Sequence, residues 1–70
     1  MYRMKITLYG SPMAREAAKI LLLNQKEVIR EEHSDKMGVV RLMLNTPIKE
    51  TSLVPLLRQS GIHGFRLDTD

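Results

Sequence analysis

The order of its short patterned segments constrains this chain more than any other feature of the sequence. Residues 2–9 alternate strictly between apolar and polar side chains, a two-residue period that is typical of a half-buried β-strand. The apolar side would carry Met4, Ile6 and Leu8, and the polar side Arg3, Lys5 and Thr7. Residues 12–23 follow at once and are dominated by strong helix formers without glycine, which predicts a helix.

The junction between this strand and this helix carries its own signals. Ser11 is a good N-cap, and Pro12 falls at the first helical position, where its missing N–H costs nothing. Asn24 is predicted to end the helix in a left-handed conformation. The apolar stripe at helical spacing predicts which side chains face the core, namely Met13, Ala17, Ile20 and Leu21, with Ala14 and Asn24 at its margins.

A hairpin is expected next. Residues 27–33 are predicted to form an edge strand, because charge along an edge discourages pairing with other chains. Residues 34–38 contain one glycine and are typical of a turn. Residues 39–44 are a stronger strand, with Val40, Leu42 and Leu44 on one side and Val39, Arg41 and Met43 on the other.

The last third of the chain repeats the helix–strand order. Pro55 fits only in the first turn of a helix, so we expect a second helix capped by Ser52. Gly61 supplies its stop signal. Residues 62–67 then predict a final strand with Phe65 and Leu67 facing inward, and residues 68–70 are expected to fray.

The complete order is strand, helix, strand, strand, helix, strand. Two right-handed crossovers that share a central hairpin give the α+β ferredoxin-like βαββαβ sandwich. The expected sheet is antiparallel with strand order 4-1-3-2, and both helices cover one face. A chain of 70 residues has room for one such domain, so we predict a single domain over residues 1–70.

Composition excludes several classes of function. The chain has no cysteine, which removes disulfides, thiolate metal sites and thiol chemistry. Its longest apolar run is residues 20–23, too short for a membrane span, so we expect a soluble cytoplasmic chain without a membrane partner. His33 and His63 have no ligand or catalytic partner at a useful spacing, and we expect no enzyme activity, cofactor or metal.

One functional surface can be inferred from the predicted sheet. The face opposite the helices would gather Arg3, Lys5 and Tyr9 from the first strand, Arg41 from the third and Arg66 from the fourth. We predict that this face binds a protein partner or a second copy of the chain. The net charge of +3 also allows RNA or single-stranded DNA, although Tyr9 alone could stack on a base there.

Over residues 3–68 the chain resembles the heavy-metal-associated domain family of copper and zinc chaperones. The most telling stretch is residues 51–62, Thr-Ser-Leu-Val-Pro-Leu-Leu-Arg-Gln-Ser-Gly-Ile, which is similar to that family's second helix and following glycine. The resemblance implies the βαββαβ fold and a role in partner docking. It implies no metal ligand here, because residues 9–13 stand where the family has its Met-x-Cys-x-x-Cys loop and contain no cysteine.

The ACT-type small-molecule-sensing domains share the same order of elements. Gly10, Ser11 and Pro12 stand where the ligand loop of those domains would be. Sensing of a small molecule at a dimer interface is therefore a further alternative.

Overall fold

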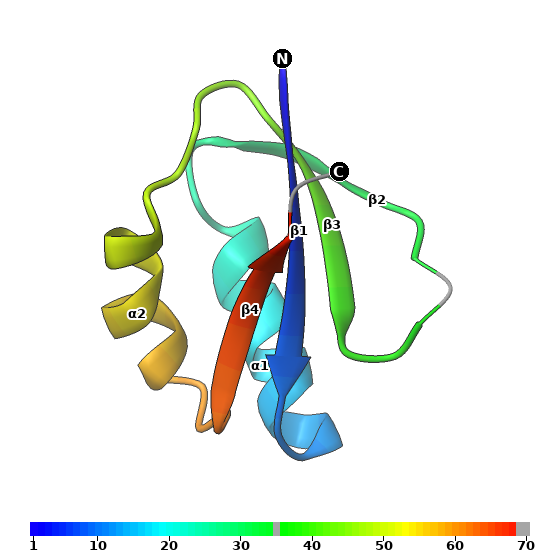
Figure 1. The fold of residues 1–70 in the computed structure, drawn as a ribbon, viewed down its shortest axis with the longest axis vertical. Coiled ribbons are helices and arrows are strands. Elements are labelled where there is room, and N and C mark those ends of the chain that lie inside the picture. The colour runs from blue at the N-terminus through cyan, green and yellow to red at the C-terminus, as the bar shows by residue number, and fades with distance from the viewer. Residues whose placement is uncertain (35, 69–70) are drawn as a thin grey trace.

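The predicted order of helices and strands is present in the computed structural model of the protein, which describes residues 1–34 and 36–68 (Figure 1). The elements are β1 (Tyr2–Tyr9), α1 (Pro12–Leu23), β2 (Val28–Glu32), β3 (Val39–Leu44), α2 (Glu50–Arg58) and β4 (Gly64–Asp68). Asp35, in the predicted turn, and Thr69 and Asp70, in the predicted frayed end, lie outside the described residues.

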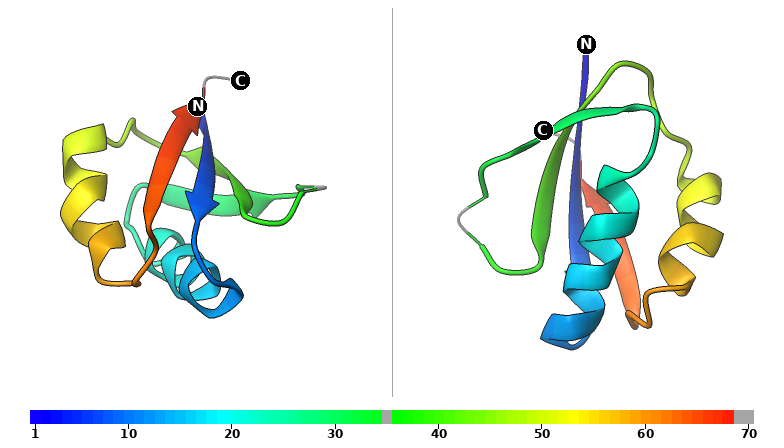
Figure 2. Two further views of the ribbon diagram at one scale, coloured as in Figure 1. Left: turned by 60° about the horizontal axis from the view of Figure 1, so that its bottom comes forward. Right: turned by 180° about the vertical axis from the view of Figure 1, so that it is seen from behind.

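The four strands form one antiparallel sheet in the order β2-β3-β1-β4, which confirms the predicted topology. Ile6 in the central strand β1 lies opposite Val40 of β3 and opposite Leu67 of β4. Both helices lie on the same side of this sheet (Figure 2). The fold is therefore the ferredoxin-like βαββαβ sandwich, with one covered sheet face and one uncovered face.

A single apolar cluster fills the space between the sheet and the helices. It consists of Met4, Ile6, Leu8, Ala18, Leu22, Val40, Leu42, Leu44, Leu53 and Leu57. Phe65 and Leu67 of β4 are half-buried and pack against it, so the predicted inward faces of β1, β3 and β4 are confirmed. Full burial of one such leucine or isoleucine side chain contributes about 1.5–3 kcal/mol, so a few residues supply most of the stability.

Helix α1 begins as predicted but is rotated about its axis relative to the prediction. The Ser11 hydroxyl accepts a hydrogen bond from the Ala14 amide at 3.1 Å, which confirms the N-cap. The buried side chains are Ala14, Ala18 and Leu22, whereas Met13 is 85% exposed and Ile20 51% exposed. The predicted stripe of Met13, Ala17, Ile20 and Leu21 is wrong, because two alanines let the helix lie close to the sheet.

The end of α1 and the start of α2 also differ from the prediction. Asn24 ends α1 with a right-handed φ of −85°, not the left-handed conformation expected. Helix α2 begins at Glu50 after Lys49, so Ser52 is not its cap and Pro55 lies inside the helix. Burial of Leu53 and Leu57 on one side of α2 outweighs the poor fit of proline there. The predicted stop is confirmed, since Gly61 has a φ of +85°.

The two edge strands are displaced slightly from their predicted ranges. β2 ends at Glu32 rather than His33 and carries a register shift between Val28 and Arg30. β4 runs from Gly64 to Asp68, so Asp68 belongs to the sheet instead of fraying. No helix in the described ranges has the length and apolar character needed to cross a membrane.

Candidate functional site

All five residues predicted to bind a partner lie on the uncovered face of the sheet. Arg3, Lys5 and Tyr9 alternate with the buried apolar residues of β1. Arg41 lies directly opposite Lys5, and Arg66 lies directly opposite Thr7 on the same face. We call this surface the open sheet face. Its described members are Arg3, Lys5, Thr7, Tyr9, Arg30, Glu32, Val39, Arg41, Met43, Gly64, Arg66 and Asp68.

A row of charged side chains crosses the centre of the open sheet face. Glu32 of β2 lies opposite Arg41 of β3, Arg41 lies opposite Lys5 of β1, and Lys5 lies opposite Asp68 of β4. Two cations thus occupy the central strands, and a carboxylate flanks them at each edge. Directly opposite like charges destabilise a sheet, and the two carboxylates at the edges of the row offset this repulsion.

Two ion pairs tie the flanking carboxylates to arginines of the neighbouring rows. Arg3 Nε lies 3.5 Å from Glu32 Oε1, and Arg66 Nε lies 3.2 Å from Asp68 Oδ1. The arginine side chains are 61% and 63% exposed, and exposed pairs of this kind contribute about 0–1 kcal/mol. These contacts orient the arginines but leave their guanidinium groups open to solvent.

Sequence reasoning missed part of this surface. Arg30, Glu32 and Asp68 also lie on it, opposite Met43, Arg41 and Lys5. Among the described residues the face therefore carries five basic side chains and two acidic ones, not a set of cations alone. They are Arg3, Lys5, Arg30, Arg41 and Arg66 against Glu32 and Asp68.

Met43 is an apolar, buried residue within this charged face. Its neighbours across the strands are Arg3 on one side and Arg30 on the other. Met43 is only 5% exposed although no helix covers it, because its long neighbours extend over it. Tyr9, 45% exposed and opposite Gly64, is the one aromatic side chain that the described residues place on the open sheet face. The face therefore combines charge with limited apolar area.

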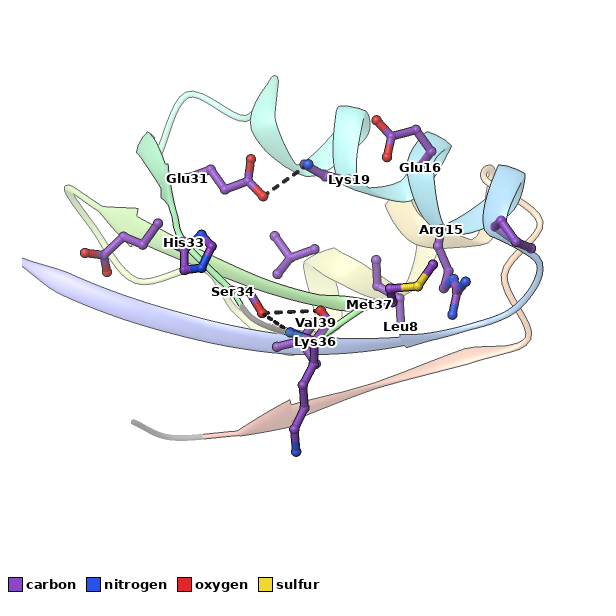
Figure 3. Close-up of a pocket in the computed structure, with 14 residues that line it drawn as sticks. Leu8, Arg15, Glu16, Lys19, Glu31, His33, Ser34, Lys36, Met37 and Val39 are labelled. Atoms are coloured by element: carbon purple, nitrogen blue, oxygen red, sulfur yellow. Dashed lines mark hydrogen bonds and ion pairs between the residues drawn. The ribbon is translucent and has the colours of Figure 1, made fainter.

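Apart from the open sheet face, the molecule has a concave groove between α1 and the β2–β3 hairpin (Figure 3). This groove has a volume of about 670 Å³, and its walls carry charges of both signs. Lys19 Nζ of α1 and Glu31 Oε2 of β2 form an ion pair at 3.3 Å within it. The Lys36 side chain is directed away from the groove, and the Arg15 side chain packs closely over Gly38.

The β1–α1 loop has a structural role. The Ser11 hydroxyl is occupied by the Ala14 amide, and Pro12 starts α1. A Cβ on Gly10 would lie 3.1 Å from the Ile62 backbone. The loop therefore packs directly against the segment that precedes β4. In the ranges 1–34 and 36–68, no three His, Asp or Glu side chains converge as metal ligands would.

Comparison with known proteins supports the fold. No protein-family model and no curated protein matches this sequence. Among solved structures, the chain is similar to the solution structure of the yeast copper-transporter domain CCC2A, determined in its apo and Cu(I)-loaded states. The two share a TM-score of 0.72 at 11% identity, over 100% of this chain and 99% of the other. The predicted likeness to heavy-metal-associated domains is thereby confirmed for the fold.

Proposed function

We propose that this protein is a small non-enzymatic docking module whose contact surface is the open sheet face. One observation carries the proposal: the five side chains singled out from the sequence share the face that both helices leave uncovered. A flat surface of this kind suits a protein partner better than a small molecule, which usually binds in a concave, mostly apolar pocket.

The charge arrangement supports an acidic partner surface. An incoming carboxylate between Lys5 and Arg41 would relieve the repulsion of these two central cations. Arg3 and Arg66, each already oriented by a carboxylate, flank that position. Tyr9, which is 45% exposed, would supply an aromatic contact of the kind that interface centres commonly use. Such binding should weaken as salt is raised.

Metal carriage is not part of this proposal. The yeast structure similar to this chain is of a copper-transporter domain in apo and Cu(I)-loaded states. Soft metals such as Cu(I) select thiolate and thioether ligands, and this chain has no cysteine. Ser11 and Pro12 serve as cap and first residue of α1, so the residues present do not fit a thiolate metal site.

Single-stranded nucleic acid is the alternative that a specific observation favours. Five basic side chains on one face could follow a phosphate backbone. Against this, β3 places Val39, Arg41 and Met43 on the face and no aromatic side chain, so a base-stacking platform is incomplete. Small-molecule sensing gains no such support, because Gly10 packs tightly against Ile62.

Site-specific photo-crosslinking in cells tests the proposal. Benzoylphenylalanine is placed at Thr7, within the open sheet face, and as a matched control at Thr51, exposed on α2. We expect a protease-sensitive adduct with another protein from the Thr7 position alone. Equal adducts from both positions, or none from Thr7, would contradict the proposed surface. A nuclease-sensitive adduct would support the nucleic-acid alternative. An adduct with twice the mass of this chain would identify the partner as a second copy.

A further inference from the structure

The outer edge of β4 is a second surface available for pairing. Among the described residues, β4 is the terminal strand of the sheet and pairs only with β1, in a register without shifts from Gly64 to Asp68. An edge strand presents unpaired N–H and C=O groups to a further strand. The opposite edge is different, because β2 is interrupted by a bulge between Val28 and Arg30. A bulge of this kind twists an edge and discourages strand addition.

A groove runs beside β4 and is bounded on its other side by α2. Its walls are the apolar side chains of Val54, Leu57, Ile62 and Phe65, and Arg58 and His63 contribute its polar rim. Figure 1 shows α2 alongside β4 at this end of the sheet. The volume is about 170 Å³, below the roughly 300–1,000 Å³ of ordinary small-molecule pockets. The groove therefore fits one large side chain rather than a small-molecule ligand.

Two glycines leave the backbone beside this groove uncrowded. A Cβ built on Gly61 or on Gly64 would meet no atom within 4 Å. Glycine within a strand commonly marks a place where another backbone approaches closely. Gly64 is also the first residue of β4, so the open space lies where an added strand would begin or end.

We propose that the β4 edge accepts an extended segment of a partner protein in which apolar and acidic side chains alternate. In such a segment alternate side chains point to opposite faces of the sheet. On the helix side, an apolar side chain would enter the groove between Val54 and Phe65. On the other side, an acidic side chain would lie next to Arg66 of β4. Arg58 at the groove rim adds a second positive charge near the segment, against the single carboxylate of Asp68 among the described residues of β4. This is β-strand addition, a recurring mode of peptide recognition.

A single segment suits this edge better than a second copy of the chain. Antiparallel pairing of two β4 strands would bring the second α2 to the same side of the joined sheet, against the first α2. An isolated extended segment meets no such obstacle. The inference does not rest on docking at the open sheet face, since it uses the edge of β4 and the groove beside it.

Peptide binding followed by amide NMR tests this inference. The probe is an acetylated seven-residue peptide of alternating leucine and glutamate, added to the isotope-labelled full chain. We expect the largest shifts in residues 64–68 and slowed hydrogen exchange at alternate amides of β4. A peptide with lysine in place of glutamate should bind at least tenfold more weakly. The leucine–glutamate peptide with a central proline should not bind, since proline cannot donate to the ladder.

Two variants separate the groove from the rest of the molecule. Val54→Glu places a negative charge at the groove, where Val54 is 39% exposed, and should weaken binding of the acidic peptide at least tenfold. Ile20→Glu makes the same kind of change on α1, where Ile20 is 51% exposed, and should leave binding within twofold of the unchanged chain. Amide spectra of both variants establish that each is folded.

Several results would overturn the inference. They are no shifts at millimolar peptide, shifts centred on β2 or on Lys5 and Arg41, and undiminished binding by a folded Val54→Glu variant. A dimer in sedimentation velocity with protected β4 amides in the absence of peptide would assign the edge to a second copy, and would overturn the proposed partner. Shifts centred on Lys5 and Arg41 would overturn the edge proposal while supporting the open sheet face, and the other results do not bear on crosslinking from Thr7. The two proposals can therefore fail separately.

Discussion

Replacing Leu22 by alanine tests the rotation of α1 more sharply than any other single change. Leu22 is fully buried in the apolar cluster, so Leu22→Ala removes its transfer energy and leaves a cavity. Such substitutions cost about 2–5 kcal/mol, and we expect about 3 kcal/mol. A chain of 70 residues has a total stability of roughly 3.5–10 kcal/mol, so the variant should lose about 30% of it or more. The corresponding fall in Tm is about 12–24 °C.

The matched control is Ile20→Ala, two positions away on the same helix. Ile20 is 51% exposed, so about half of its transfer energy was never gained on folding, and alanine is the better helix former. We expect a loss of about 0.5–1 kcal/mol. Urea unfolding followed by circular dichroism measures both variants, and comparable m-values would license the comparison. If Ile20→Ala costs as much as Leu22→Ala or more, the stripe predicted from the sequence is correct and the packing described here is wrong.

Three further changes have defined outcomes. Ser11→Ala removes the 3.1 Å cap bond to Ala14 and should cost about 1 kcal/mol in urea unfolding, whereas no loss would mean that the cap is not formed in solution. Pro55→Ala restores an amide inside α2. An interior proline costs about 3 kcal/mol relative to alanine, and the greater freedom of the unfolded variant offsets about 0.4–1 kcal/mol of that, so we expect a net stabilisation of about 2–2.6 kcal/mol. A folded but destabilised Pro55→Ala variant would show that the proline is well accommodated. Cu(I) offered in competition with a chelating dye should not be retained with submicromolar affinity, because the chain has no thiolate ligand, and retention at one equivalent would refute that assignment.

The strands of this fold could be predicted from sequence because a two-residue period fixes which side chains share a face. β1 and β3 have the bounds predicted for them, and every residue predicted to face the core from these two strands is buried. Met43 is buried as well, although it lies on the other side of β3. A shift by one residue would expose every apolar side chain of a strand, so alternation leaves little freedom. The bounds of the edge strands were predicted less accurately. In β2 the bulge between Val28 and Arg30 breaks the alternation on which the prediction depends.

The helices show where periodicity fails. α1 contains apolar residues around most of its circumference, so two overlapping stripes satisfy a helical period. The larger side chains, Met13 and Ile20, favour one stripe, but close approach to the sheet requires the smaller Ala14 and Ala18. For α2, the local cost of Pro55 favoured a helix that begins after Ser52. The helix instead begins at Glu50, because this start allows Leu53 and Leu57 to be buried. In both helices, tertiary packing determined which side chains are buried, and a local sequence pattern carries no information about that packing.

The candidate site was partly predictable for the same reasons. Arg3, Lys5, Tyr9, Arg41 and Arg66 follow from strand alternation once the topology is known. Glu32 and Asp68 could not be assigned to the open sheet face, because the first depends on a bulge and the second on how far β4 extends. Their presence changes the chemistry of the surface from a plain cationic patch to two central cations bounded by carboxylates.

The affinity of the protein crosslinked from Thr7, measured by calorimetry at low salt, tests the central claim most directly. Lys5→Glu and Arg41→Glu each reverse a central charge of the open sheet face, and each should weaken binding at least tenfold. Lys26→Glu makes the same change in net charge at an exposed position after α1 and should leave the affinity within twofold of the unchanged chain. Undiminished binding by a folded Arg41→Glu variant, or an equal loss for Lys26→Glu, would contradict the assignment of this face.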